Sequence, residues 1–226
     1  MPVPFHSVAA AAATLRDGPP PSVLGLDEPL GALGVVIRRE AGEEIFAEGE
    51  EAEAVYQIVS GAVRSYRILG DGRRHVCDFH MPGDVLGLEA GETHLCTAEG
   101  MTPVVLRATP RRVLQRLSVE NGLLGQRLWA LTVCGMRRCQ DHASMLSRLG
   151  ATERVAAFLV SFADRLGADD ELELPMTRQD IADYLGLTIH TVSRTLSQLE
   201  DMGMIDARAT RRIRLRRQDE LAELCA

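Results

Sequence analysis

Apolar and polar positions change their spacing along the chain. From Val35 to Thr109, short apolar runs are separated by glycine or proline at intervals of about 8–12 residues, which is typical of antiparallel strands. Three of these runs are Ala54–Ser60, Ala62–Leu69 and Arg74–His80. The last two flank a Gly-Asp-Gly segment at 70–72, which favours a hairpin turn. This region therefore predicts a β-sandwich or a β-barrel.

After Pro110 the turn signals become sparse and a long helical pattern follows. Its seam has the 4-3-4-3 spacing of a coiled coil and consists of Leu124, Leu128, Leu131, Met145 and Leu149, with Gly135, Arg138 and His142 between them. A helix of about 28 residues is about 42 Å long, more than one small domain covers. We therefore expect a symmetric dimer with the five apolar residues at its seam, in preference to an ordinary helical bundle.

A second amphipathic stretch, Thr152–Leu166, precedes two short helical patterns. Thr177 and Asp180 have the spacing of a capping box at the start of the first pattern. Gly186 allows a tight turn directly after Leu185. Two short helices joined by a turn that contains glycine predict a helix-turn-helix.

The second of these helices, capped by Thr188, separates its side chains onto two faces. The apolar face consists of Ile189, Val192, Leu196 and Leu199. The opposite face carries His190, Ser193, Arg194 and Ser197. Small polar groups and one arginine suit entry into the major groove of DNA, because bulky side chains would hold the helix away from the base edges.

An arginine-rich segment follows this helix. Ile213 and Leu215 alternate with arginines, which predicts one strand of a β-hairpin wing. Between Thr177 and Arg217, eight arginines against five acidic residues give a local charge of +3. A positive run beside a helix-turn-helix favours contact with DNA phosphates over a solvated surface without a partner.

Composition narrows the class of protein. The 226 residues are 46% hydrophobic and 25% charged, which suits one or two globular domains and excludes a disordered chain or a disulfide-stapled miniprotein. No apolar run approaches the roughly 18 residues of a membrane-spanning helix, so we expect no membrane partner. All 25 basic residues are arginines, and the net charge is −7. That total alone argues against a nucleic-acid partner, but it averages an acidic amino-terminal region with the basic segment.

The amino terminus and the cysteines indicate the compartment. Residues 1–34 contain an alanine run and a Gly-Pro-Pro-Pro block, which predict a flexible extension rather than a secretory signal. Five irregularly spaced cysteines are typical of free thiols in a reducing compartment, so we expect a cytoplasmic protein. Cys134, Cys139 and Cys225 are candidate redox thiols. Ordinary packing is favoured for the first two, and Cys225, in the tail, is expected to be the most accessible.

Five motifs resemble a known family: A-G-E-x-I-F-x-E-G-E (41–50), V-x-G-A-V-R (59–64), P-G-D-V-L-G (82–87), E-R-V-A-A-F-L (153–159) and D-Y-L-G-L-T-x-x-T-V-S-R-T-L-S-x-L (183–199). From about Val35 to Arg217 the chain resembles the CRP/FNR family of bacterial transcription regulators, and most closely its FixK-like branch. The resemblance implies an α+β protein with a jelly-roll-like, cyclic-nucleotide-binding-like β-barrel, a long dimerisation helix and a C-terminal winged helix-turn-helix. The domains would be a flexible extension (1–34), a sensor-like barrel (35–110), a dimerisation region (111–150) and a DNA-binding domain (151–226).

The resemblance also implies particular base contacts. The FNR-type recognition helix carries Glu-x-x-Ser-Arg and reads a TTGAT half-site; Ser193 and Arg194 match this motif, whereas His190 stands where glutamate is usual. Arg194 would bind guanine through O6 and N7, and His190 would accept from cytosine or donate to a base or phosphate. Support of the DNA backbone or groove is assigned to Thr177, Thr188, Thr191, Ser197, Arg211 and Arg212.

The ligand sets known from this family do not recur in the sequence. Gly91–Ala98 holds no arginine for a cyclic phosphate, no cysteine precedes Cys77 for an iron–sulfur cluster, and Gly87–Glu89 lacks the Cys-x-His of haem-binding members. Strand alternation would place His75, Cys77 and Phe79 on one face, where ordinary packing is favoured over a metal corner. We therefore expect neither a cofactor nor a metal.

These observations predict a dimeric, sequence-specific transcription activator. The resemblance implies contact with RNA polymerase and control of microaerobic, respiratory or nitrogen-fixation genes. An effector-gated regulator that binds a small molecule or haem in the barrel is the alternative. A metal-dependent jelly-roll enzyme is disfavoured, because His75, His80 and His94 are the only histidines of the barrel and show no His-x-His spacing.

Overall fold

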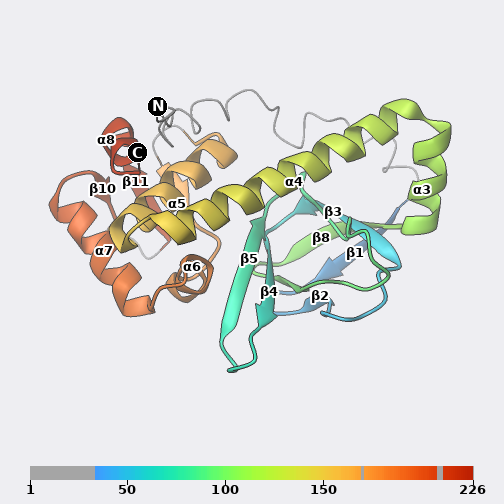
Figure 1. Cartoon of the computed structure of the whole chain (residues 1–226), viewed down its shortest axis with the longest axis horizontal. Coiled ribbons are helices and arrows are strands. Elements are labelled where there is room, and N and C mark those ends of the chain that lie inside the picture. The colour runs from blue at the N-terminus through green and yellow to red at the C-terminus, as the bar shows by residue number, and fades with distance from the viewer. Residues whose placement is uncertain (1–33, 169–170, 208–210, 226) are drawn as a thin grey trace, which may run out of the picture. The chain divides into compact units, whose positions relative to one another are not determined.

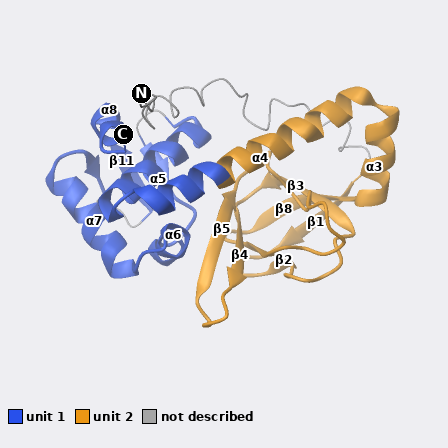
Figure 2. Cartoon of the chain, viewed as in Figure 1, with its two compact units in different colours: residues 1–18, 140–226 blue, residues 19–139 orange. Residues whose placement is uncertain are grey.

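The computed structural model describes residues 34–168, 171–207 and 211–225 (Figure 1). Nearly all of the predicted amino-terminal extension, 1–34, lies outside these ranges. The described chain divides into two compact units, one up to Cys139 and the other from Gln140 onward (Figure 2). The boundary falls inside one long helix, so this helix contributes to both units.

The described part of the first unit contains two four-stranded antiparallel sheets. Their strands are β1 (Val35–Arg39), β2 (Glu44–Phe46), β3 (Ala54–Ser60), β4 (Val63–Ile68), β5 (Arg74–His80), β6 (Val85–Leu86), β7 (Thr97–Gly100) and β8 (Val104–Pro110). The strand orders are β1-β8-β3-β6 and β2-β7-β4-β5. Ile58, Val63 and Leu106 are at most 1% exposed and lie in one apolar core. The β-domain is jelly-roll-like, as predicted, but its sheets are open rather than closed into a barrel.

A bulge in β5 changes which side chains face the core. Cys77 is the extra residue, opposite the step from Ser65 to Tyr66 on β4. As a result Val76 and Phe79 are both buried, although they are three positions apart. The predicted common face of His75, Cys77 and Phe79 is therefore wrong.

Two helices follow the β-domain, α3 (Arg111–Glu120) and α4 (Gly122–Arg148). With 27 residues, α4 confirms the predicted long helix. The first half of its apolar seam packs within its own chain. Leu124 is buried in a cluster with residues of β3 and α3, and Leu128 and Leu131 pack against that cluster. These leucines cover the β-domain to which they belong.

The two polar members of the seam also bind within the chain. Arg138 Nε lies 3.0 Å from Asp78 Oδ2 on β5, in the first unit. In the second unit, His142 Nε2 lies 2.8 Å from the backbone oxygen of Tyr184. Their position on a mainly apolar face is explained by these contacts.

The second unit contains helices around a small sheet with the strand order β10-β11-β9. Its further elements are α5 (Ala151–Leu166), β9 (Glu171–Glu173), α6 (Arg178–Leu185), α7 (Ile189–Asp201), β10 (Ile205–Asp206), β11 (Arg212–Leu215) and α8 (Gln218–Glu223). Leu172, Leu185 and Leu199 are completely buried in this unit. The order of helices and strands confirms the predicted winged helix-turn-helix. Within the described residues, no helix is both long and apolar enough to cross a lipid bilayer.

Candidate nucleic-acid interface

The first helix of the motif, α6, begins at a complete capping box. Thr177 Oγ1 accepts a hydrogen bond from the Asp180 backbone N–H at 3.1 Å, and the Asp180 carboxylate accepts one from the Thr177 backbone N–H at 2.9 Å. The helix ends at Gly186, whose φ of 63° is in the left-handed region that favours glycine. The cap and the turn, both predicted from the sequence, fix where α7 starts.

Helix α7 begins at Thr188, whose Oγ1 accepts from the backbone N–H of Thr191 at 3.1 Å. Its buried face consists of Val192, Thr195, Leu196 and Leu199. Ile189 was expected on this face but is 38% exposed, because it lies in the first turn at the margin of the buried face. Thr195, which the apolar pattern did not include, is buried on this face at 2% exposure.

The polar residues of α7 lie together on the opposite face. His190, Arg194 and Ser197 are exposed, and Ser193 between them is half-buried. Their 3- and 4-residue spacing places them on one side of the helix. Arg194 has neither a hydrogen bond nor an ion pair within the described part of the chain, so its guanidinium is available to an outside acceptor.

The wing behind α7 also follows the predicted pattern. In β11, Ile213 and Leu215 are buried whereas Arg212 and Arg214 are exposed. The strand pairs with β10 on one side and with β9 on the other. Arg208, which the sequence also assigned to the positive run, lies outside the described residues.

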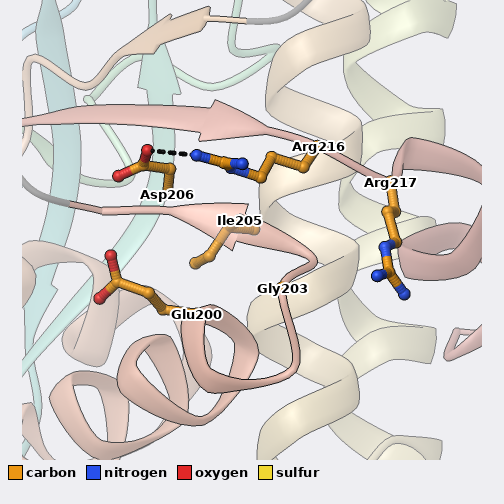
Figure 3. Close-up of a pocket in the computed structure, with 6 residues that line it drawn as sticks. All are labelled: Glu200, Gly203, Ile205, Asp206, Arg216 and Arg217. Atoms are coloured by element: carbon orange, nitrogen blue, oxygen red, sulfur yellow. Dashed lines mark hydrogen bonds and ion pairs between the residues drawn. The ribbon is translucent and has the colours of Figure 1, made fainter.

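Several arginines of the wing are already paired with acidic residues. Figure 3 shows the base of the wing, where Arg216 reaches Asp206 at 2.9 Å and Arg217 points away from that pair. Arg217 instead lies 3.1 Å from Glu220 of α8. Arg214 has a longer pair, 3.7 Å, with Glu171 of β9.

The positive charge left for phosphates is therefore smaller than the count of arginines suggests. Arg211 and Arg212 are exposed and, within the described ranges, have no ion pair or hydrogen bond of their side chains. Arg212 is the first residue of β11, and Arg211 directly precedes it. With Arg194 on α7 they are the exposed arginines of the motif and wing whose side chains have no partner within the described residues.

The candidate redox thiols differ in accessibility. Cys134 and Cys139 are exposed on α4, whereas Cys225 is buried. The Cys225 Sγ lies 3.2 Å from the Leu221 carbonyl, and burial raises the pKa of this thiol to about 11. The prediction that Cys225 is the most accessible thiol is wrong, because the end of the chain folds as α8 and packs against α5.

The loop between β6 and β7 is held by the chain's own side chains. The buried ring of His94 stacks on Phe46 with 3.6 Å between centroids, and its Nδ1 lies 3.3 Å from Glu89. Arg111 donates hydrogen bonds to the carbonyls of Ala52, at 3.2 Å, and Gly91, at 2.8 Å, and also bonds the Glu89 carbonyl. Within the described residues, no group of three or more His, Cys, Asp or Glu side chains has the arrangement of a metal site.

A helix-turn-helix whose second helix exposes a polar face, a wing with arginines that have no partner among the described residues, and a separate jelly-roll-like domain define the class of protein: a DNA-binding transcription regulator with an additional sensor-type domain. Comparison with known proteins gives the family. Residues 36–121 match the cyclic nucleotide-binding domain, and residues 153–224 match the Crp-like helix-turn-helix domain. The chain belongs to the CRP/FNR family of transcription regulators and is of the FixK/FNR type.

Its relatives include regulators with known physiological roles. The chain is 44% identical over 197 residues to the nitrogen fixation regulation protein FixK of Rhizobium meliloti (strain 1021), covering 87% of this chain and 90% of that protein. It is 32% identical over 198 residues to electron transport regulator A of Shewanella oneidensis, covering 83% and 79% of the two chains. The solved structure of FixK2 from Bradyrhizobium japonicum superposes with a TM-score of 0.82 at 43% identity, over 86% of this chain and 98% of that one. These relatives are regulators rather than enzymes.

Proposed function

We propose that this regulator is a cytoplasmic homodimer that binds a two-fold symmetric DNA site with TTGAT-like half-sites and activates transcription through contact with RNA polymerase. The observation that carries the proposal is the exposed face of α7, where Arg194 lies between polar side chains and has no partner among the residues that the structure describes. The names of its relatives point to nitrogen fixation and electron transport, so we infer that its target genes serve microaerobic respiration or nitrogen fixation.

Within each half-site the side chains would have different tasks. Arg194 binds one guanine through O6 and N7, a contact worth about 1–3 kcal/mol of discrimination. Ser193 and His190 contact neighbouring bases. The support residues are Thr177, Thr188, Thr191, Ser197, Arg211 and Arg212.

The support residues act in two ways. The hydroxyls of Thr177 and Thr188 already cap α6 and α7, so these residues position the helix ends rather than bind phosphate directly. Arg211 and Arg212 are exposed and have no side-chain partner in the described part of the chain, and they suit direct phosphate contact.

The dimer would form along α4. The apolar seam read from the sequence, Leu124, Leu128, Leu131, Met145 and Leu149, is already half-buried or buried within one chain. The other side of the helix presents Trp129, 72% exposed, and Met136, 54% exposed, with half-buried Val133 between them at the same 4-3 spacing. We infer that this second stripe faces the partner copy, because large exposed apolar side chains at coiled-coil spacing are typical of a helix interface.

We further propose that the regulator acts without a bound effector. The loop whose counterpart holds the phosphate in cyclic-nucleotide-binding relatives carries Glu89 and Glu92 and is tied internally by Arg111. A cyclic phosphate would meet these carboxylates without a free cation. Ultraviolet spectra and elemental analysis of the purified protein test this: a nucleotide, haem or iron signature would support the effector-gated alternative.

The base contacts are tested by mobility shifts on duplexes with single changes in one half-site. We expect Arg194→Ala to bind every duplex with the same weak affinity, because it removes the guanine contact. His190→Ala should keep specific binding and lose discrimination at one position only. Equal discrimination by the wild type and Arg194→Ala would refute the assignment of α7 as the recognition helix.

A further inference from the structure

One side chain ties together the ends of two helices in the DNA-binding unit. Arg154, in the first turn of α5, donates from Nε to the Leu149 carbonyl at 2.9 Å and from Nη2 to the Leu146 carbonyl at 2.8 Å. Its Nη1 donates to the Leu185 carbonyl at 3.0 Å. Leu146 lies in the last turn of α4, Leu149 directly follows this helix, and Leu185 ends α6. The guanidinium thus connects the end of α4 with the first helix of the DNA-binding motif.

We call these contacts between the end of α4 and the end of α6 the joint. Their chemistry favours arginine. The last carbonyls of a helix have no partner within the helix and carry the negative end of its dipole. A planar guanidinium presents several donors in fixed directions, whereas a lysine ammonium is a single point charge. The turn of the motif also lies against the joint, since a Cβ on Gly186 would be 3.8 Å from Arg154 Nη1.

His142 makes a second connection between the same two helices. Its Nε2 donates to the Tyr184 carbonyl at 2.8 Å, because a carbonyl oxygen only accepts. The imidazole also stacks on the Tyr184 ring, with 3.9 Å between centroids and 4° between planes. His142 is 8% exposed, so this contact is shielded from solvent. The last turns of α4 are therefore held to α6 by two independent groups.

We propose that Arg154 is a positioning residue: with His142 it fixes the helix-turn-helix to the end of α4, so that the pairing of α4 in the dimer sets the spacing and orientation of the two recognition helices. The inference rests on the proposed dimeric function. It also assigns a role to the arginine of the 153–159 motif, which the base contacts leave without one.

The test measures how strongly binding depends on the spacing of half-sites. Full-length protein is titrated by fluorescence anisotropy against palindromes with identical half-sites and central spacers changed by one or two base pairs. Each added base pair rotates one half-site by about 34° relative to the other, so a rigid joint discriminates among spacers. The variant is Arg154→Met, and the matched control is Arg148→Met, which removes an exposed arginine from the last turn of α4.

We expect the wild type and Arg148→Met to prefer one spacer by about tenfold or more, equivalent to about 1.4 kcal/mol. In Arg154→Met the preference should fall to about threefold or less, with unchanged sedimentation and unchanged affinity for a single half-site. If folded Arg154→Met retains the full spacer preference, the inference about Arg154 is wrong, while the proposed dimeric function stands. A wild type without any preference overturns the proposed dimeric function as well.

A second pair of variants covers the case in which Arg154→Met does not fold. In His142→Gln the side-chain amide can still donate to the Tyr184 carbonyl, whereas in His142→Leu it cannot. We expect the glutamine variant to retain more of the spacer preference than the leucine variant. If the two variants show the same spacer preference, the proposal that the contacts between α4 and α6 set this preference is wrong.

Discussion

At the scale of residues, the arginines of the DNA-binding unit differ in whether their charge is already neutralised. Arg211 and Arg212 have no acidic partner in the described parts of the chain, whereas Arg214, Arg216 and Arg217 do. An arginine that is paired with a carboxylate attracts a phosphate less strongly, because the carboxylate repels the DNA. Contact with the DNA backbone is therefore expected from Arg211 and Arg212 before the paired arginines of the wing.

This distinction predicts the salt dependence of binding. Arg212→Ala should weaken binding to all sequences alike and reduce the slope of log K against log salt by about one per protomer, because one phosphate contact is lost. Arg217→Ala, which removes the partner of Glu220, should leave the slope unchanged. Titrations at several salt concentrations measure both. Equal slopes for the wild type and Arg212→Ala would contradict the phosphate contact.

The thiols provide a second prediction at this scale. At pH 8, native protein treated with iodoacetamide should be modified at Cys134 and Cys139 but not at Cys225. Cys225 is buried and burial raises its pKa to about 11, so at that pH the thiol is inaccessible and stays protonated. Peptide mass spectrometry of native and unfolded protein locates the modifications. Comparable native modification of Cys225 would contradict the packing of α8.

Single residues were predictable where their role is local. The caps at Thr177 and Thr188 and the turn at Gly186 depend on neighbours within three residues, and the structure shows each as predicted. The burial of Cys225 depends on α5, about 70 positions away in sequence, and no local pattern reports such packing. Local chemistry was therefore read correctly at the helix ends, and tertiary burial was not.

At the scale of elements, periodicity identified most helices and strands but not always their neighbours. The a/d pattern of α4 correctly predicted a helix of nearly the observed length. It did not reveal that Leu124, Leu128 and Leu131 pack against the β-domain of the same chain. An apolar stripe shows which face of a helix is buried but not which element packs against it. In β5, the bulge at Cys77 interrupts the alternation on which the predicted face depended.

The second stripe of α4 gives the prediction at this scale. Trp129→Glu should raise the dissociation constant of the dimer by at least about tenfold, because two buried indoles are replaced by charges in a symmetric interface. Leu123→Glu is the matched control: it replaces another exposed apolar residue, 56% exposed, on a different side of the helix. Sedimentation equilibrium measures both. A larger effect of Leu123→Glu than of Trp129→Glu would contradict the assigned interface.

At the scale of the whole molecule, the total charge of −7 conceals the placement of charge. A chain with this total nevertheless exposes Arg194 on the recognition helix and Arg211 and Arg212 at the wing, and in the described ranges these three side chains have no partner. The motifs allowed the order of the domains to be predicted from the sequence, because each motif is local and specific. The pairing of wing arginines with acids could not be predicted, because it depends on contacts such as that of Arg214 with Glu171 of β9.

The central claim is that the protein reads a symmetric sequence through Arg194, and chromatin immunoprecipitation with sequencing tests it most directly. Wild type and Arg194→Ala are expressed at equal levels in the native host under oxygen limitation. The account predicts that wild-type peaks share a palindrome with TTGAT-like half-sites upstream of respiratory or nitrogen-fixation genes, and that these peaks disappear in Arg194→Ala. Wild-type peaks without a symmetric motif, or identical peaks in the two strains, would contradict it.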